Sequence, residues 1–158
     1  MVTATTKFAT RQGVRLAYSD TGSDGPALVL IHGWTCNRGH WRNQVAELSE
    51  DHRVVTLDLR GHGDSDKPEQ DYTIAGFADD VAWLIREPGL TRPVVVGHSM
   101  GGVIAAQLER KHPEATPGIV LVDAPIVPLT PTLKPVADGL VAGLQGPAYQ
   151  QVAEGFPR

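Results

Sequence analysis

Ser99 is the residue whose setting in this sequence best suits covalent chemistry. It stands between Gly97 and Gly101 in the pattern Gly-x-Ser-x-Gly, directly after a run of valines at residues 94–96. Small residues two before and two after a serine permit a sharp turn from a strand into a helix, because the backbone then passes close to the serine Cβ. Such a turn, a nucleophile elbow, lifts the hydroxyl above the end of the strand and near the positive end of a helix. The pattern predicts that Ser99 is a nucleophile.

The residues around Ser99 favour this interpretation over a chance match in a loop. Met100, Ile104 and Leu108 follow the serine at helical spacing, so a strand, a turn and a helix come in the required order. The motif alone also occurs in ordinary loops. If only the motif is considered, an ordinary loop therefore stays an alternative.

The rest of the chain alternates between strand and helix patterns. Strands are expected at 6–10 and 14–19 and, as buried apolar runs, at 27–31, 53–58, 94–98 and 118–123. Apolar residues at helical spacing predict helices near 41–48, from a cap at Thr73 to Pro88, and from 100 to 111, with Asp79 and Asp80 on a solvated face. Parallel neighbours need crossover connections, so this order predicts an α/β fold with a parallel sheet.

Length, charge and cysteine content limit the kind of protein and its partners. The chain has 158 residues, 41% of them hydrophobic, which suits one compact domain. A net charge of −4 and the lack of a basic run argue against a nucleic-acid surface, so a small-molecule partner is expected. Cys36 is the single cysteine, which excludes an internal disulfide. Residues 1–7 have no signal-peptide core and 27–31 is too short to span a bilayer, so we expect a cytoplasmic protein without a membrane partner.

Four segments carry a resemblance to a known family. They are HGWTCN at 32–37, DLRGHGDSDKP at 58–68, VVVGHSMGG at 94–102 and IVLVDAP at 119–125. In this order they resemble the α/β-hydrolase superfamily, in the branch of esterases, lactonases, cofactor-free haloperoxidases and carbon–carbon bond hydrolases. The resemblance implies a mostly parallel sheet with helices on both faces over residues 1–127, strands one to six, and the beginning of a helical lid at 128–158. It also implies a serine hydrolase that acts on carboxylic esters or lactones without a cofactor.

The resemblance extends to individual site residues. The backbone amides of Trp34 and Met100 match the two oxyanion donors of the family, which suit acyl transfer because negative charge develops on a carbonyl oxygen. Residues expected to support the site rather than react are His32, Gly33, Gly97, His98 and Gly101. Haloperoxidase, perhydrolase and carbon–carbon bond hydrolase activities need the same serine and stay open. Dehalogenase and epoxide-hydrolase relatives use aspartate there and are disfavoured.

A metal site is not expected. His62 and Asp64 form an H-x-D pair in a glycine-containing loop, but a hydrolytic zinc site needs at least three protein ligands, and no dense cluster of ligands accompanies the pair. The glycines around His62 are more simply explained as fixing a turn.

The sequence departs from the family in its acid and base. The family triad runs serine, acid, histidine, yet no histidine follows His112, which lies about 20 Å along the helix from Ser99. Asp123 is the only plausible acid in these residues, although most members place the acid one strand later. We therefore expect the acid and the histidine outside this chain, and the segment 1–158 alone to be inactive and to self-associate or need a complementing C-terminal segment. A non-catalytic α/β binding domain or an inactive fragment is the alternative from another class.

Overall fold

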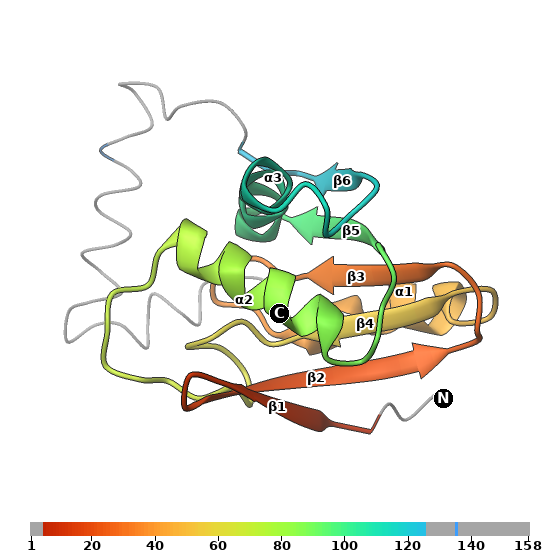
Figure 1. The fold of residues 1–158 in the computed structure, drawn as a ribbon, viewed down its shortest axis with the longest axis horizontal. Coiled ribbons are helices and arrows are strands. Elements are labelled where there is room, and N and C mark those ends of the chain that lie inside the picture. Colours follow the sequence, from red (N-terminus) through yellow and green to blue (C-terminus); the bar gives the residue numbers. More distant parts are fainter. Residues whose placement is uncertain (1–4, 126–134, 136–158) are drawn as a thin grey trace. The chain divides into compact units, whose positions relative to one another are not determined.

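Six strands form one mixed sheet in the computed structural model, which describes residues 5–125 and Pro135 (Figure 1). The order across the sheet is β1-β2-β4-β3-β5-β6. The strands are β1 Lys7–Arg11, β2 Val14–Gly22, β3 Ala27–Ile31, β4 Arg53–Leu57, β5 Val94–His98 and β6 Ile119–Val122. The expected strands are all present, with ends that differ by a few residues.

Strands β4, β3, β5 and β6 run parallel, and their register decides where the loops emerge. Ile31 lies opposite Leu57 on one side and Gly97 on the other, and Gly97 lies opposite Leu121. The carboxyl ends of these strands are thus level with one another. Loops that follow them share one edge of the sheet, which is where α/β proteins place their ligands. Strand β2 pairs antiparallel with β1 and β4.

Helices cover both faces of the sheet. The helices α2 Ile74–Arg86 and α3 Met100–Lys111 lie on one face, while the 3-10 turn η1 Arg38–Trp41 and the helix α1 Arg42–Leu48 lie on the other (Figure 1). Val29 and Ile31 of β3 belong to the hydrophobic cluster of α2 and α3, whereas Leu30 packs with Trp41. A strand buried on both faces needs apolar residues at every position. This arrangement agrees with the α/β class predicted from the sequence.

Helix α2 begins as its sequence predicts. The side chain of Thr73 accepts a hydrogen bond of 3.0 Å from the amide of Gly76, which caps the first turn. The prediction that Asp80 lies on a solvated face is wrong, since Asp80 is 1% exposed. Two arginines, Arg11 and Arg60, form ion pairs with it and make its burial tolerable.

Strand β6 departs from its predicted burial. A strand forms as expected, but Val120 is 46% exposed, Leu121 37% and Val122 39%. Within the part of the chain that the structure describes, β6 pairs only with β5 and occupies the edge of the sheet. An apolar strand with an open edge results.

The predicted lid at 128–158 falls outside the described residues, apart from Pro135. Residues 1–124 group as one compact unit, and the boundary at residue 127 stays a prediction. None of the helices within 5–125 is long and apolar enough to cross a membrane.

Candidate active site

Ser99 lies in the turn between β5 and α3. Its backbone has φ 53° and ψ −120°, a conformation that residues with a side chain rarely adopt. The amide of Ser99 donates to the carbonyl oxygen of Val122 at 2.9 Å, and the carbonyl oxygen of Ser99 accepts from the amide of Gly102 at 2.9 Å. These bonds hold an unfavourable backbone conformation and place the half-buried serine at the carboxyl edge of the sheet.

Three glycines are required for this turn by direct contact. A Cβ at Gly97 would lie 2.2 Å from the carbonyl oxygen of Gly101, and a Cβ at Gly101 would lie 2.3 Å from that of Ile31. A Cβ at Gly102 would lie 2.4 Å from the Cβ of Ala124. The sequence motif indicated the first two glycines. The requirement for Gly102 depends on the strand that α3 packs against, which the motif does not include.

The loop after β3 approaches the turn closely. A Cβ at Gly33 would lie 3.2 Å from both the Cβ of Ser99 and Nδ1 of His98. Across residues 5–125, the backbone amides of Trp34 and Met100 donate no hydrogen bond to another residue that the structure describes. The two predicted oxyanion donors thus belong to segments that meet beside Ser99. The Trp34 side chain is 39% exposed.

His32 holds this loop against the loop after β4. Its ring is 1% exposed, Nδ1 lies 2.7 Å from the carbonyl oxygen of Gly33, and the amide of Leu59 donates to Nε2 at 3.1 Å. Burial lowers the pKa of His32 to about 4. A neutral ring with both nitrogens engaged has no lone pair left to act as a base.

His98 lies beneath the same loop. Its ring stands edge to face against Trp41, with centroids 6.5 Å apart. The contact continues to the face of the sheet covered by α1, where Trp41 packs against Leu30. These contacts pack the His98 ring against the face of the sheet that α1 covers.

A buried ion pair, which no local sequence pattern predicted, joins the loops after β3 and β4. Asp58 is fully buried and pairs with the Arg38 guanidinium. The amides of Arg38 and Asp64 also donate to its carboxylate, at 2.6 Å and 2.8 Å. The second terminal nitrogen of Arg38 reaches Asp64 at 2.8 Å. The network fixes the segment that follows the predicted oxyanion loop.

The H-x-D pair is engaged elsewhere. His62 Nδ1 donates to the carbonyl oxygen of Arg60 at 3.1 Å, and Asp64 pairs with Arg38. No group of three or more His, Cys, Asp or Glu side chains that could hold a metal ion occurs among residues 5–125.

The candidate acid and the last histidine lie at different ends of α3. Asp123 follows β6 as Ser99 follows β5, it is exposed, and its φ is 48°. His112 lies beyond the C-terminus of α3, where Nε2 is 2.7 Å from a carboxylate oxygen of Asp79. The structure therefore places Asp123, but not His112, at the edge of the sheet that carries Ser99.

Comparison with known proteins adds to this geometry. The model of the α/β hydrolase fold family matches residues 26–158. Epoxide hydrolase 3 of Xenopus tropicalis is 36% identical over 116 residues, which cover 72% of this chain and 32% of that protein. A solved N-acyl homoserine lactone degrading enzyme has a TM-score of 0.78 and 31% identity, over 92% of this chain and 54% of that one. A thermophilic esterase from Thermogutta terrifontis has a TM-score of 0.79 and 31% identity, over 92% and 55%.

The extent of these matches limits what they say about the whole protein. The chain spans about a third of the length of the curated relatives it matches, and about half of the two solved chains. The matched region includes every segment that forms the site around Ser99. The sheet order, the family match and these relatives together show that the chain belongs to the α/β-hydrolase fold family.

Proposed function

We propose that this chain carries the nucleophile and the oxyanion donors of a serine hydrolase that acts on carboxylic esters or lactones. One observation carries the proposal: the strained Ser99 turn lies in contact distance of the Gly33 loop. The match to the α/β hydrolase fold family supports the part of the proposal that concerns hydrolysis. The choice of ester or lactone rests on the serine and on two structural relatives, an esterase and a lactone-degrading enzyme.

The proposed reaction begins with attack of Ser99 Oγ on the acyl carbon. The serine proton passes to a general base, and the carbonyl oxygen takes up negative charge in a tetrahedral intermediate. The amides of Trp34 and Met100 donate to that oxygen, and fixed backbone donors need no reorganisation as the charge develops. Collapse expels the alcohol, and water then releases the acid from the acyl-serine by the reverse steps.

The general base is proposed to lie outside residues 1–158, and the acid either lies there too or is Asp123. His32 is neutral with both ring nitrogens engaged, and His112 pairs with Asp79 at the other end of α3. Asp123 stays a candidate acid, because Ser99 bonds to the residue before it. A cytoplasmic location likewise stays a prediction.

An epoxide hydrolase among the relatives provides the competing function. As set out above, the epoxide hydrolases of the superfamily carry aspartate at the nucleophile position, and this chain has Ser99 there. Attack of the Ser99 hydroxyl oxygen on an epoxide carbon would open the ring and give an ether, which water does not cleave readily. The serine therefore favours acyl transfer.

Labelling with a fluorophosphonate probe tests the proposal in the whole protein that contains this chain. We expect labelling that disappears in Ser99→Ala and persists in Ser23→Ala, which changes an exposed serine in the loop before β3. The unchanged protein should turn over aryl esters or lactones but not epoxides. Ser99→Ala should lose this turnover together with the label. Labelling that persists in Ser99→Ala, or none in the unchanged protein, would contradict the proposal.

A further inference from the structure

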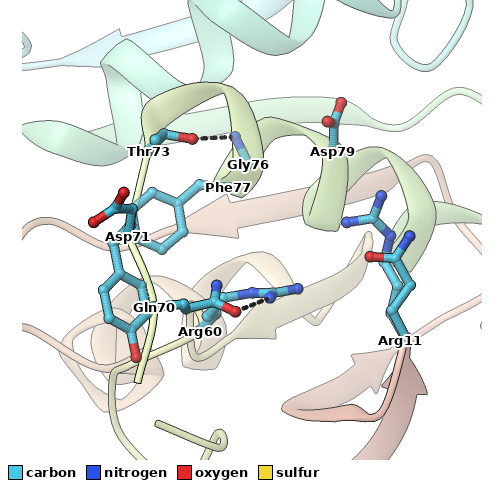
Figure 2. A pocket seen from close by; sticks show the side chains of 10 residues that line it. Arg11, Arg60, Gln70, Asp71, Thr73, Gly76, Phe77 and Asp79 are labelled. Carbon is cyan, nitrogen blue, oxygen red and sulfur yellow. Dashed lines mark hydrogen bonds between the residues drawn. The ribbon is translucent and has the colours of Figure 1, made fainter. Parts of the chain in front are cut away.

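A polar recess lies between the tip of the β1–β2 hairpin, the loop after β4 and the first turn of α2 (Figure 2). Its volume is about 250 Å³, and its lining includes Arg11, Arg60, Gln70 and Phe77 but neither Ser99 nor Gly33. Pockets for drug-sized ligands have about 300–1,000 Å³. The recess therefore suits a small ligand, at a place separate from the proposed active site.

Two arginines in this recess share one buried carboxylate. Arg60 binds Asp80 in a bidentate manner, with Nε 2.7 Å from one oxygen and Nη2 2.8 Å from the other. Arg11 Nη1 lies 2.6 Å from the oxygen that Nη2 of Arg60 contacts. The two guanidinium groups are thus adjacent, and together with the single carboxylate they carry a net charge of +1.

The other acidic residues in the lining do not cancel this charge locally. Asp79 is engaged by Lys111, with Nζ 2.7 Å from one oxygen, and by His112 at the other. Asp71 is exposed. Figure 2 shows both carboxylates pointing away from the guanidinium groups, while the end of Arg60 points toward Arg11.

Donor groups remain for a ligand. Arg11 has five N–H groups, and Asp80 is its only side-chain partner among the described residues. Gln70 accepts from Arg60 through Oε1 at 3.3 Å, so its amide N–H groups are not used in that bond. Arg11 and Gln70 together thus offer a ligand more hydrogen-bond donors than acceptors. The planar guanidinium of arginine matches the geometry of carboxylate and phosphate oxygens.

We propose that this recess binds a small oxyanion, a phosphate or a carboxylate group, between Arg11 and Arg60. The buried Asp80 holds the two guanidinium groups in place, so that binding does not have to immobilise them. Arg60 is 12% exposed and Arg11 21%, which makes Arg11 the more accessible of the two cations. The ligand supplies the negative charge that Asp80 alone does not.

Isothermal titration calorimetry with inorganic phosphate, and separately with acetate, tests this site in the whole protein that contains the chain. Sodium chloride at matched ionic strength is the reference for non-specific screening. We expect saturable binding of at least one of the two anions. Phosphate without acetate would identify a phosphate site, and acetate without phosphate a carboxylate site.

Arg11→Gln should weaken this binding by at least about tenfold, because a charge-assisted bond is lost. Arg60 keeps its bidentate contact with Asp80 in that variant, so the fold should persist, and Arg11→Lys, which keeps the charge, should bind with intermediate affinity. Arg15→Gln is the matched control, since it removes the same charge at an exposed position of β2 that lies outside the recess. No saturable binding, or equal loss in the Arg11 and Arg15 variants, would overturn the proposal. If Arg11→Gln does not fold, unchanged affinity in a folded Arg11→Lys variant together with loss in Arg15→Gln would also overturn it.

Discussion

The amide of Leu59 donates a hydrogen bond of 3.1 Å to Nε2 of His32, and this bond fixes the protonation state of the ring. An amide can only donate, so Nε2 must carry the lone pair. The proton then lies on Nδ1, which donates to the carbonyl oxygen of Gly33 at 2.7 Å. A second proton would face the N–H of Leu59, and burial lowers the pKa of His32 to about 4. The loop that carries Gly33 therefore depends on a neutral histidine.

This dependence predicts a loss of stability in mild acid. A histidine in the unfolded chain has a pKa near 6.5, so between pH 6.5 and 4 the unfolded state binds more protons than the folded state. The free energy of unfolding should fall as the pH decreases through this window, by about 3 kcal/mol in full. Chemical denaturation at pH 7, 5.5 and 4.5 measures it.

The variant His32→Gln should show a smaller pH dependence, because glutamine offers an acceptor and a donor but does not titrate. His62, whose pKa is also lowered by burial, accounts for part of the remaining slope. The control Asn43→Gln changes an exposed residue that does not titrate and should keep the wild-type slope. An unchanged slope in His32→Gln would show that another group causes the acid sensitivity.

Gly97→Ala should destabilise the protein by about 3 kcal/mol or more, because the added Cβ meets backbone rather than a movable side chain. Gly118→Ala is the control, since a Cβ at Gly118 meets nothing within 4 Å. Urea denaturation measures both. Similar stabilities of the two variants would mean that the turn at Ser99 is less closely packed than the structure shows.

Local patterns predicted most of the fold. The Thr73 cap, the apolar spacing of α2 and the apolar run of β3 each depend on residues close in sequence, so the chain itself shows them. The glycines beside Ser99 were predicted for the same reason. These local features predicted the strand, the turn and the helix that place Ser99 between β5 and α3.

Long-range charge pairing could not be predicted. Arg11 and Asp80 are 69 residues apart and meet only because the β1–β2 hairpin lies beside α2, which turns a predicted solvated face into a buried one. Arg38 and Asp58 meet because β3 and β4 are neighbours in the sheet. The exposure of β6 likewise follows from its place at the edge, not from its apolar sequence.

Arg38→Met should cost about 3 kcal/mol of stability, because it leaves the fully buried carboxylate of Asp58 without its cation. Arg42→Met, at an exposed position four residues further on, removes the same charge and should change stability little. Thermal unfolding compares the two. Equal melting temperatures would contradict a structural role for the ion pair.

Trp34→Ala should alter the acyl-chain preference of the whole enzyme. The amide of Trp34 is proposed to face the oxyanion, and its large, partly exposed indole is then expected to narrow the acyl side of the site. Loss of the ring should raise kcat/KM for longer p-nitrophenyl esters relative to the acetate. Tyr72→Ala, at another exposed aromatic residue, is the control. A preference that does not change in Trp34→Ala would exclude the indole from the acyl site.

A segment limited to residues 1–158 should associate with itself through β6. Among the residues that the structure describes, no strand pairs with the outer edge of β6. Its exposed side chains are apolar, without a lysine or proline to block pairing with another edge. Size-exclusion chromatography should show oligomers that have no activity towards aryl acetates. Val120→Lys places a charge on the exposed edge and should shift the segment towards a monomer.

Gln44→Lys adds the same charge on exposed α1, away from β6, and should leave the oligomers unchanged. An active monomer in the unchanged segment would contradict both the edge pairing and the proposal that the general base lies outside these residues. Oligomers that persist in Val120→Lys would place the contact on another surface. A shift towards the monomer in Val120→Lys but not in Gln44→Lys would identify β6 as the associating edge. A lysine on β6 would oppose the pairing of this strand with a strand of another copy, whereas a lysine on α1 would not.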